Sequence, residues 1–158
     1  MIWYVGHYGD DIGRLDPSTG KVRTYKAPTR RSGLRWMEAD AEGNLWVAGH
    51  ESGKLVKVDY RTGAVTEYTP PTEDSGPFSL AVDLSRNLIW FGESNAGKVG
   101  RFDPKTGSFL EFPLPSATIG GEFSDGKVVW VEVDPVRANR IWWAGGTPAK
   151  IGYIEVIE

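Results

Sequence analysis

The stretch that decides the fold is Ile89-Trp90-Phe91-Gly92, followed by Val99-Gly100-Arg101-Phe102-Asp103-Pro104-Lys105-Thr106-Gly107. Two earlier versions of this phrase begin at Ile2-Trp3-Tyr4-Val5 and at Leu45-Trp46-Val47-Ala48. Trp3, Trp46 and Trp90 recur at intervals of 43 and 44 residues. A repeat of this length, built from short alternating strands, is typical of a β-propeller blade.

The repeat predicts where each strand of a blade lies. Innermost first strands are expected at Gly33–Asp40, Pro77–Asp83 and Lys127–Asp134, each followed by a polar turn and a tryptophan-containing strand. The third strand ends in Asp-Pro-x-Thr-Gly or a close variant, where proline and glycine suit a turn and a bulge. We interpret the aspartate of this motif as a turn-former.

The chain opens on a second strand and closes on a third strand, Lys150–Val156. We therefore predict an all-β protein with groups of three, four, four and three antiparallel strands, about 3.5–4 blades. It is treated as a single β-propeller-type domain over residues 1–158. The repeats are approximately 1–32, 33–75, 76–126 and 127–158.

The predicted blades do not form a complete ring by themselves. Known propellers close with about four to eight blades, and two of the four blades predicted here are incomplete. Two interpretations follow: the chain is half of a larger ring, or two chains form a homodimer that completes one. The last repeat is longer because of a glycine-rich segment, Ser116–Lys127. Insertions of this kind map to loops on one face, which is often the binding face.

Composition narrows the class of protein. The 158 residues carry a net charge of −3 with scattered basic residues, so we expect no nucleic-acid partner. No apolar run approaches the roughly 18 residues of a membrane span, and the absence of cysteine excludes thiolate chemistry. No signal peptide precedes the first strand, which predicts a cytoplasmic protein if the chain is complete. A secreted or periplasmic location follows if an N-terminal part is missing.

Two histidines, His7 and His50, occupy the same repeat position, four residues after a tryptophan. The repeat places them at the ends of equivalent strands, so they are the candidate catalytic residues. Together with Glu93, they would make a base-and-metal site, since imidazole titrates near neutral pH and binds divalent metals. The alternative is that both histidines are polar strand-end residues bonded to backbone or water.

A second group lies on the predicted first strands. Glu38 and Glu132 each stand two residues before the turn aspartate, and Ala81 fills the slot between them. With Glu93, these are the candidate metal ligands, because carboxylate oxygens suit magnesium or calcium. Pairing with nearby cations is the alternative. Trp36 and Trp130 share the same strands and, with Arg35, are the candidate substrate-binding residues for a small cyclic or aromatic ligand.

The segments Gly97-Lys98-Val99-Gly100-Arg101-Phe102-Asp103-Pro104-Lys105-Thr106-Gly107 and Phe109-Leu110-Glu111-Phe112-Pro113-Leu114-Pro115 resemble the virginiamycin B lyase (streptogramin lyase) family over essentially the whole chain. The resemblance implies a seven-bladed propeller that opens a cyclic depsipeptide by elimination, with a divalent metal, usually Mg²⁺, and a histidine base. That family commonly has Trp-Phe-Thr-Glu on the second strand. Here the glutamate position is held by Gly6, Gly49, Glu93 and Gly145.

Three functions follow as hypotheses. The first is a lyase-like propeller whose metal polarises the ester while His7 or His50 removes the proton. The second is a non-catalytic propeller that binds a ligand or a protein, in keeping with the missing glutamates. The third is a calcium-dependent lactone hydrolase-like propeller, which would consume water.

Overall fold

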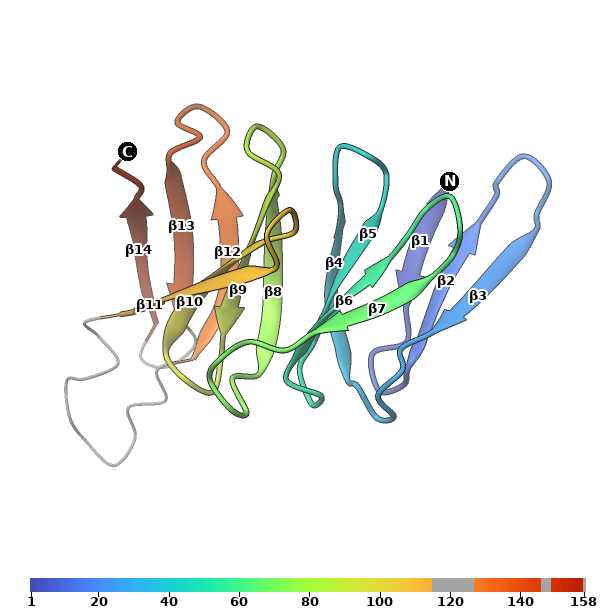
Figure 1. The fold of residues 1–158 in the computed structure, drawn as a ribbon, viewed down its shortest axis with the longest axis horizontal. Helices are drawn as coiled ribbons and strands as arrows, with labels where there is room; N and C mark the ends of the chain where they lie inside the picture. Colours follow the sequence, from blue (N-terminus) through green and yellow to red (C-terminus); the bar gives the residue numbers. More distant parts are fainter. Residues whose placement is uncertain (115–126, 146–148, 158) are drawn as a thin grey trace.

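The computed structural model describes residues 1–114, 127–145 and 149–157, and these residues form fourteen β-strands (Figure 1). The strands make four antiparallel sheets of three, four, four and three strands, each in sequence order. The predicted all-β partial propeller is confirmed. Of the predicted loop Ser116–Lys127, only Lys127 lies within the described residues.

We call the sheets the first to fourth blade. The first blade comprises β1 (Ile2–Val5), β2 (Asp11–Leu15) and β3 (Val22–Lys26). The second comprises β4 (Leu34–Ala39), β5 (Leu45–Gly49), β6 (Lys54–Val58) and β7 (Val65–Tyr68). The third comprises β8 (Pro77–Asp83), β9 (Leu88–Glu93), β10 (Lys98–Asp103) and β11 (Ser108–Pro113). The fourth comprises β12 (Val128–Val133), β13 (Arg140–Gly145) and β14 (Lys150–Glu155).

The strands β4, β8 and β12 pack next to one another, and we call them the inner strands. Their observed bounds lie within one residue of those predicted, and the differences have local causes. Gly33 has a positive φ of 59°, so β4 begins one residue later. Asp40 ends β4 because its carboxylate accepts hydrogen bonds from the turn that follows.

The turns that recur in each repeat are built by aspartate side chains that accept hydrogen bonds from the backbone. Asp59 accepts hydrogen bonds from the backbone N–H groups of Arg61 and Thr62, at 3.0 and 2.7 Å. Asp103 accepts one from Lys105 at 2.8 Å. These bonds satisfy turn donors locally, so the interpretation of this aspartate as a turn-former is confirmed.

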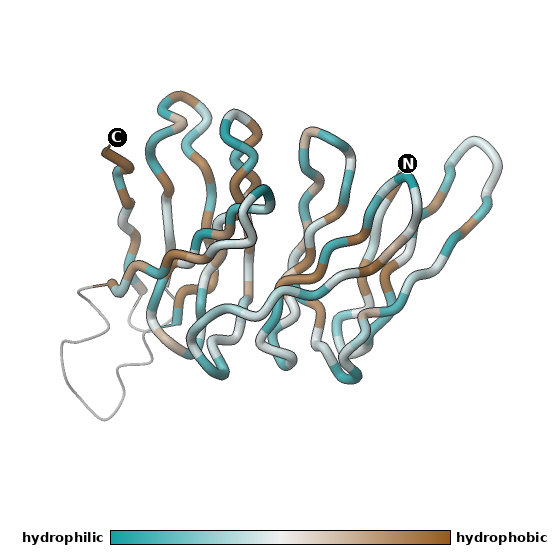
Figure 2. Tube along the Cα trace, viewed as in Figure 1, coloured by the Kyte–Doolittle hydropathy of each residue, from teal (hydrophilic) through white to brown (hydrophobic). Residues whose placement is uncertain are grey.

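Each pair of neighbouring blades encloses its own hydrophobic core. Trp46 and Phe91 are fully buried between the second and third blades, and Trp90 is fully buried between the third and fourth. Hydrophobic residues lie along the strands and hydrophilic ones gather at the turns (Figure 2). Stability therefore comes chiefly from blade-to-blade contacts, as in other repeat proteins.

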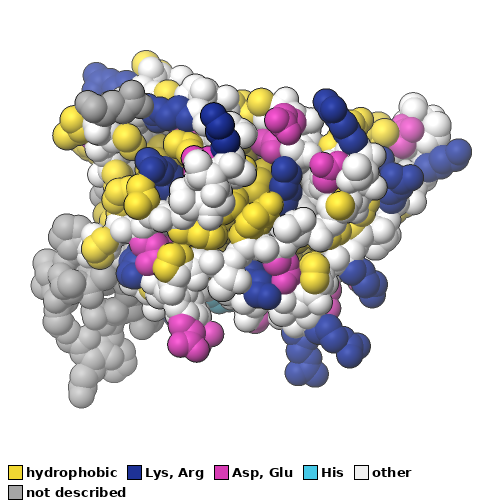
Figure 3. Space-filling view, in the orientation of Figure 1, with side chains coloured by type: hydrophobic (Ala, Val, Ile, Leu, Met, Phe, Trp, Pro, Cys, Tyr) yellow, Lys and Arg dark blue, Asp and Glu magenta, His cyan; other side chains and the backbone are white. Residues whose placement is uncertain are grey.

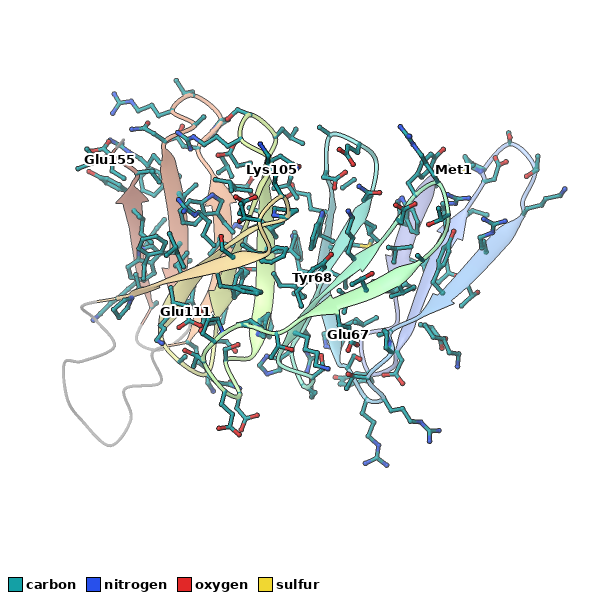
Figure 4. The ribbon with its side chains drawn as sticks, viewed as in Figure 1. Met1, Glu67, Tyr68, Lys105, Glu111 and Glu155 are labelled. Atoms are coloured by element: carbon teal, nitrogen blue, oxygen red, sulfur yellow. The ribbon has the colours of Figure 1, made fainter. Side chains whose placement is uncertain are left out.

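A glutamate on the outermost strand of each of the second and third blades forms an ion pair within its blade and hydrogen bonds to the linker that precedes that blade. Glu67 on β7 binds Lys54 at 2.9 Å and accepts the backbone N–H of Thr29. Glu111 on β11 makes the same ion pair with Lys98 and also bonds Thr72. Figure 4 shows Glu67 and Glu111 at corresponding places on their strands.

The outward faces of the first and fourth blades expose apolar side chains, including Tyr4 and Ile151. Elsewhere, positive and negative side chains are interspersed over the face seen in Figure 3. None of the described residues belongs to a helix long and apolar enough to cross a bilayer.

Candidate functional site

His50 follows the end of β5 and lies in the turn that closes that strand. Its Nδ1 is 3.2 Å from the carbonyl oxygen of Gly76, and the hydroxyl of Ser94 donates to the same oxygen at 3.0 Å. A carbonyl only accepts, so Nδ1 must carry the proton in this contact. The neutral ring then has its lone pair on Nε2, the nitrogen that a general base or a metal ligand needs.

A small pocket of about 150 Å³ opens beside this imidazole. Its lining combines one imidazole, one hydroxyl, one amide and one ammonium group with two apolar side chains: His50, Ser94, Asn95, Lys127, Phe78 and Val129. The ring of Phe78 meets the imidazole edge-on, with 5.6 Å between centroids. We call this the histidine pocket.

His7 is more exposed and has a different partner. Its Nε2 contacts the Arg35 guanidinium, which only donates, so His7 accepts through Nε2. Arg35 also forms an ion pair with Glu51 at 2.5 Å. Its guanidinium lies 5.9 Å from the ring centre of Phe78. Arg35 therefore connects the first histidine to the rim of the histidine pocket.

The two histidines thus occupy equivalent positions, as predicted, but their surroundings differ. Arg35 donates to the Nε2 lone pair of His7. The hydrogen bond between His50 and Gly76 involves Nδ1 and not Nε2. Of the two candidate bases, the geometry favours His50.

Glu93 lies at the end of β9, adjoining Ser94, and is fully buried. Among the described residues, neither of its carboxylate oxygens has a hydrogen-bond partner. Burial raises the pKa of Glu93 to about 7, with a further increase from the negative charge of Glu111 and an opposing effect from Lys98. The carboxyl of Glu93 is therefore mostly protonated and uncharged at pH values below about 7.

Glu38 and Glu132 lie near the C-terminal ends of β4 and β12. They pair with Trp46 on β5 and Trp142 on β13, respectively. Glu93 instead pairs with Pro77, the first residue of β8. Glu93 therefore does not converge with the other two predicted metal ligands, Glu38 and Glu132. Trp36 and Trp130, however, are in contact, with 4.5 Å between ring centroids.

Mg²⁺ requires several oxygen ligands in a near-octahedral arrangement. Within residues 1–114, 127–145 and 149–157, no three His, Cys, Asp or Glu side chains gather in a way that could hold a metal ion. These residues alone therefore do not fit the ion that the resemblance implies.

Sequence reasoning did not single out Phe78, Asn95 or Gly76, which shape the histidine pocket. Phe78 occupies the repeat position of Arg35, and this alignment is the signal that could have found it. Gly76 has a positive φ of 60°, and a Cβ there would lie 2.5 Å from the side-chain amide nitrogen of Asn95 and 2.9 Å from the imidazole carbon Cε1 of His50. Glycine is therefore required where the backbone approaches the histidine.

The model of the virginiamycin B lyase family matches residues 1–156. The chain belongs to this family. Virginiamycin B lyase from Staphylococcus aureus is a solved structure that matches it with a TM-score of 0.74 at 20% identity, covering 98% of this chain and 51% of that one. A streptogramin B lyase structure matches with a TM-score of 0.73 at 22% identity, covering 98% and 50%. No curated protein sequence matches the chain.

This virginiamycin B lyase family member thus spans about half the length of the solved lyases it matches. Hydrazine synthase from Kuenenia stuttgartiensis matches with a TM-score of 0.74 at 14% identity, covering 92% of this chain and 40% of that one. At such identities, the likeness to solved structures concerns the fold, and chemistry must be argued from the site.

Proposed function

We propose that this chain is the His50-bearing part of a lyase-like propeller that opens a cyclic ester by elimination. The observation that carries the proposal is the fixed orientation of His50, with Nδ1 bonded to Gly76 and Nε2 left as the basic nitrogen beside a polar pocket. Membership of the virginiamycin B lyase family supports the reaction class. A catalytically inactive virginiamycin B lyase from Staphylococcus aureus with quinupristin is among the structures that match.

In the proposed step, Nε2 of His50 removes the proton from the carbon next to the one that bears the ester oxygen. The C–H electron pair forms a carbon–carbon double bond, and the C–O bond breaks, so that the carboxylate leaves with its electron pair. No water enters the products. The Nδ1–H donated to Gly76 keeps the imidazole oriented and stabilises the imidazolium that forms.

Arg35 suits the binding of the substrate's carbonyl groups, because a guanidinium offers several fixed N–H donors. Only 12% of its side chain is exposed, because it contacts His7 and Glu51 and lies beside the rings of Tyr8 and Phe78. Loss of His7 would free Arg35 to move, so we expect its effect on KM to exceed its effect on kcat.

The test is incubation of the chain with quinupristin, with and without Mg²⁺, followed by mass spectrometry. Elimination gives a linear product with the mass of the substrate, whereas hydrolysis by a lactone hydrolase adds one water. We expect His50→Asn to abolish the product and His7→Gln chiefly to raise KM. If both folded variants retain full kcat, or if the product carries an added water, the proposed elimination is wrong.

A binding propeller without catalysis is the second candidate. The histidine pocket, at about 150 Å³, is smaller than the roughly 300–1,000 Å³ of ordinary small-molecule sites. A complete site would then need further blades, either from a longer chain or from a second copy that closes the ring. Light scattering on the chain distinguishes a dimer from a monomer, and calorimetry detects quinupristin binding in the absence of turnover.

A further inference from the structure

The inner strands carry a second group of side chains, separate from the histidine pocket. Trp36 and Trp130 meet edge to face at an interplanar angle of 68°, and 39% and 40% of their surfaces remain exposed. Glu38 and Glu132 stand two residues further along the same two strands. We call these four residues the indole–carboxylate cluster.

The cluster joins the second blade to the fourth across the third. This is allowed by the small residues on β8, since Ser79 and Ala81 take the repeat positions that tryptophan and glutamate hold on β4 and β12. Both small residues are buried. Two indole rings can therefore approach over the strand that separates them.

The carboxylates concentrate negative charge beside the rings. Glu38 reaches β8 and accepts the backbone N–H of Val82. Burial raises the pKa of Glu38 against the effect of that hydrogen bond, and the charge of Glu132 raises it further. The negative charges of Glu38 and Glu132 therefore repel each other, and a cation between the two carboxylates would relieve the repulsion.

A buried polar atom provides an independent observation. The hydroxyl of Ser79 is in a residue with 1% exposure and, among the described residues, has no hydrogen-bond partner. Buried hydroxyls usually have one, because leaving them unpaired costs free energy. Ser79 shares its repeat position with the two tryptophans, so it lies on the strand between them.

We propose that the indole–carboxylate cluster is a binding site for a primary organic ammonium group. The indole faces attract a cation through their quadrupoles, and the carboxylates add charge-assisted hydrogen bonds. A primary ammonium has three N–H donors, enough for two carboxylates and one hydroxyl. A neutral ligand of the same shape gains only the apolar contact. This site is independent of the proposed elimination chemistry.

The test is NMR titration of the full 158-residue chain with n-butylammonium chloride, following the indole N–H signals. The signals of Trp36 and Trp130 are assigned from Trp36→Phe and Trp130→Phe variants. 1-Butanol is the matched neutral probe, with the same number of non-hydrogen atoms. We expect n-butylammonium to shift both signals and to bind about tenfold more tightly than 1-butanol. The double variant Glu38→Gln/Glu132→Gln should lose this preference.

Glu155→Gln is the control, because it removes a carboxylate on β14 that pairs with Arg140. It should leave the affinity for n-butylammonium unchanged. Equal binding of 1-butanol, or an unchanged preference in the double variant, would overturn the proposal. Displacement of n-butylammonium by millimolar Mg²⁺ at constant ionic strength would also overturn it, since the cluster would then be a divalent-metal site.

Discussion

Replacement of Glu93 by glutamine tests the energetic consequence of burying an unpaired carboxyl between two blades. In the wild type, the pKa is raised from an ordinary 4.5 to about 7 because the side chain is fully buried. The folded state therefore holds a proton that the unfolded state has already lost between these pH values. Stability contributed by this group falls as pH rises from 4.5 to about 7, then stays constant.

The size of the effect follows from the pKa difference. About 2.5 pH units, at about 1.4 kcal/mol for each unit, give roughly 3 kcal/mol. The glutamine of Glu93→Gln has nearly the same shape and carries no charge at any pH. Relative to wild type, the variant should become more stable by about 3 kcal/mol between pH 4.5 and pH 8.

Urea unfolding at pH 4.5, 6, 7 and 8, performed on both proteins, measures this difference. Titrating groups that do not interact with Glu93, including Glu38, contribute equally to both proteins and cancel. The variant Glu155→Gln serves as a control, because 45% of the Glu155 side chain is exposed, whereas Glu93 is fully buried. If the stability difference between Glu93→Gln and wild type changes by less than about 1 kcal/mol over this range, the reasoning about Glu93 is refuted.

Three further changes have definite expectations. Asp40→Ala should lower the free energy of unfolding by roughly 3 kcal/mol in urea titrations, because it leaves the buried indole N–H of Trp46 without its 3.0 Å acceptor. Gly76→Ala should cost about 1–3 kcal/mol and shift the NMR signals of the His50 ring, since its φ is 60° and the new Cβ would press on that ring. Glu111→Gln should lower the melting temperature through a loss of about 1 kcal/mol, because it removes the ion pair with Lys98 that joins β11 to β10.

Gly107→Ala is the matched control for the second of these changes. Its φ is 72°, but no atom lies within 4 Å of the added Cβ. Gly107→Ala should lower the free energy of unfolding through backbone strain but leave the NMR signals of the His50 ring unchanged. Equal ring shifts in both glycine variants would contradict the contact between Gly76 and His50.

The blades were predictable because their determinants are local. The tryptophan strand, the Asp-Pro-x-Thr-Gly turn and the 43-residue spacing each fix a short segment, and together they give the fourteen strands. Equivalent placement of His7 and His50 follows from the same repeat. Their different partners do not, because Arg35 and Gly76 come from the next blade in each case.

The remaining features depend on how blades pack. The sequence Trp90-Phe91-Gly92-Glu93 does not reveal that the Glu93 carboxyl is fully buried. The alternation of residues along a strand predicts which face of the sheet a side chain occupies, but not how deeply the next blade buries it. Contact between Trp36 and Trp130, 94 residues apart, depends on the curvature of three successive inner strands. Pattern reasoning placed these side chains in one register but could not bring them together.

The contact between Trp36 and Trp130 bears on how the protein unfolds. A repeat array whose units touch only their neighbours can lose its terminal units one at a time. Here the fourth blade is also anchored to the second, so that its detachment breaks contacts with two units at once. Fraying from that end is therefore penalised, and the last three blades are expected to melt as one cooperative block.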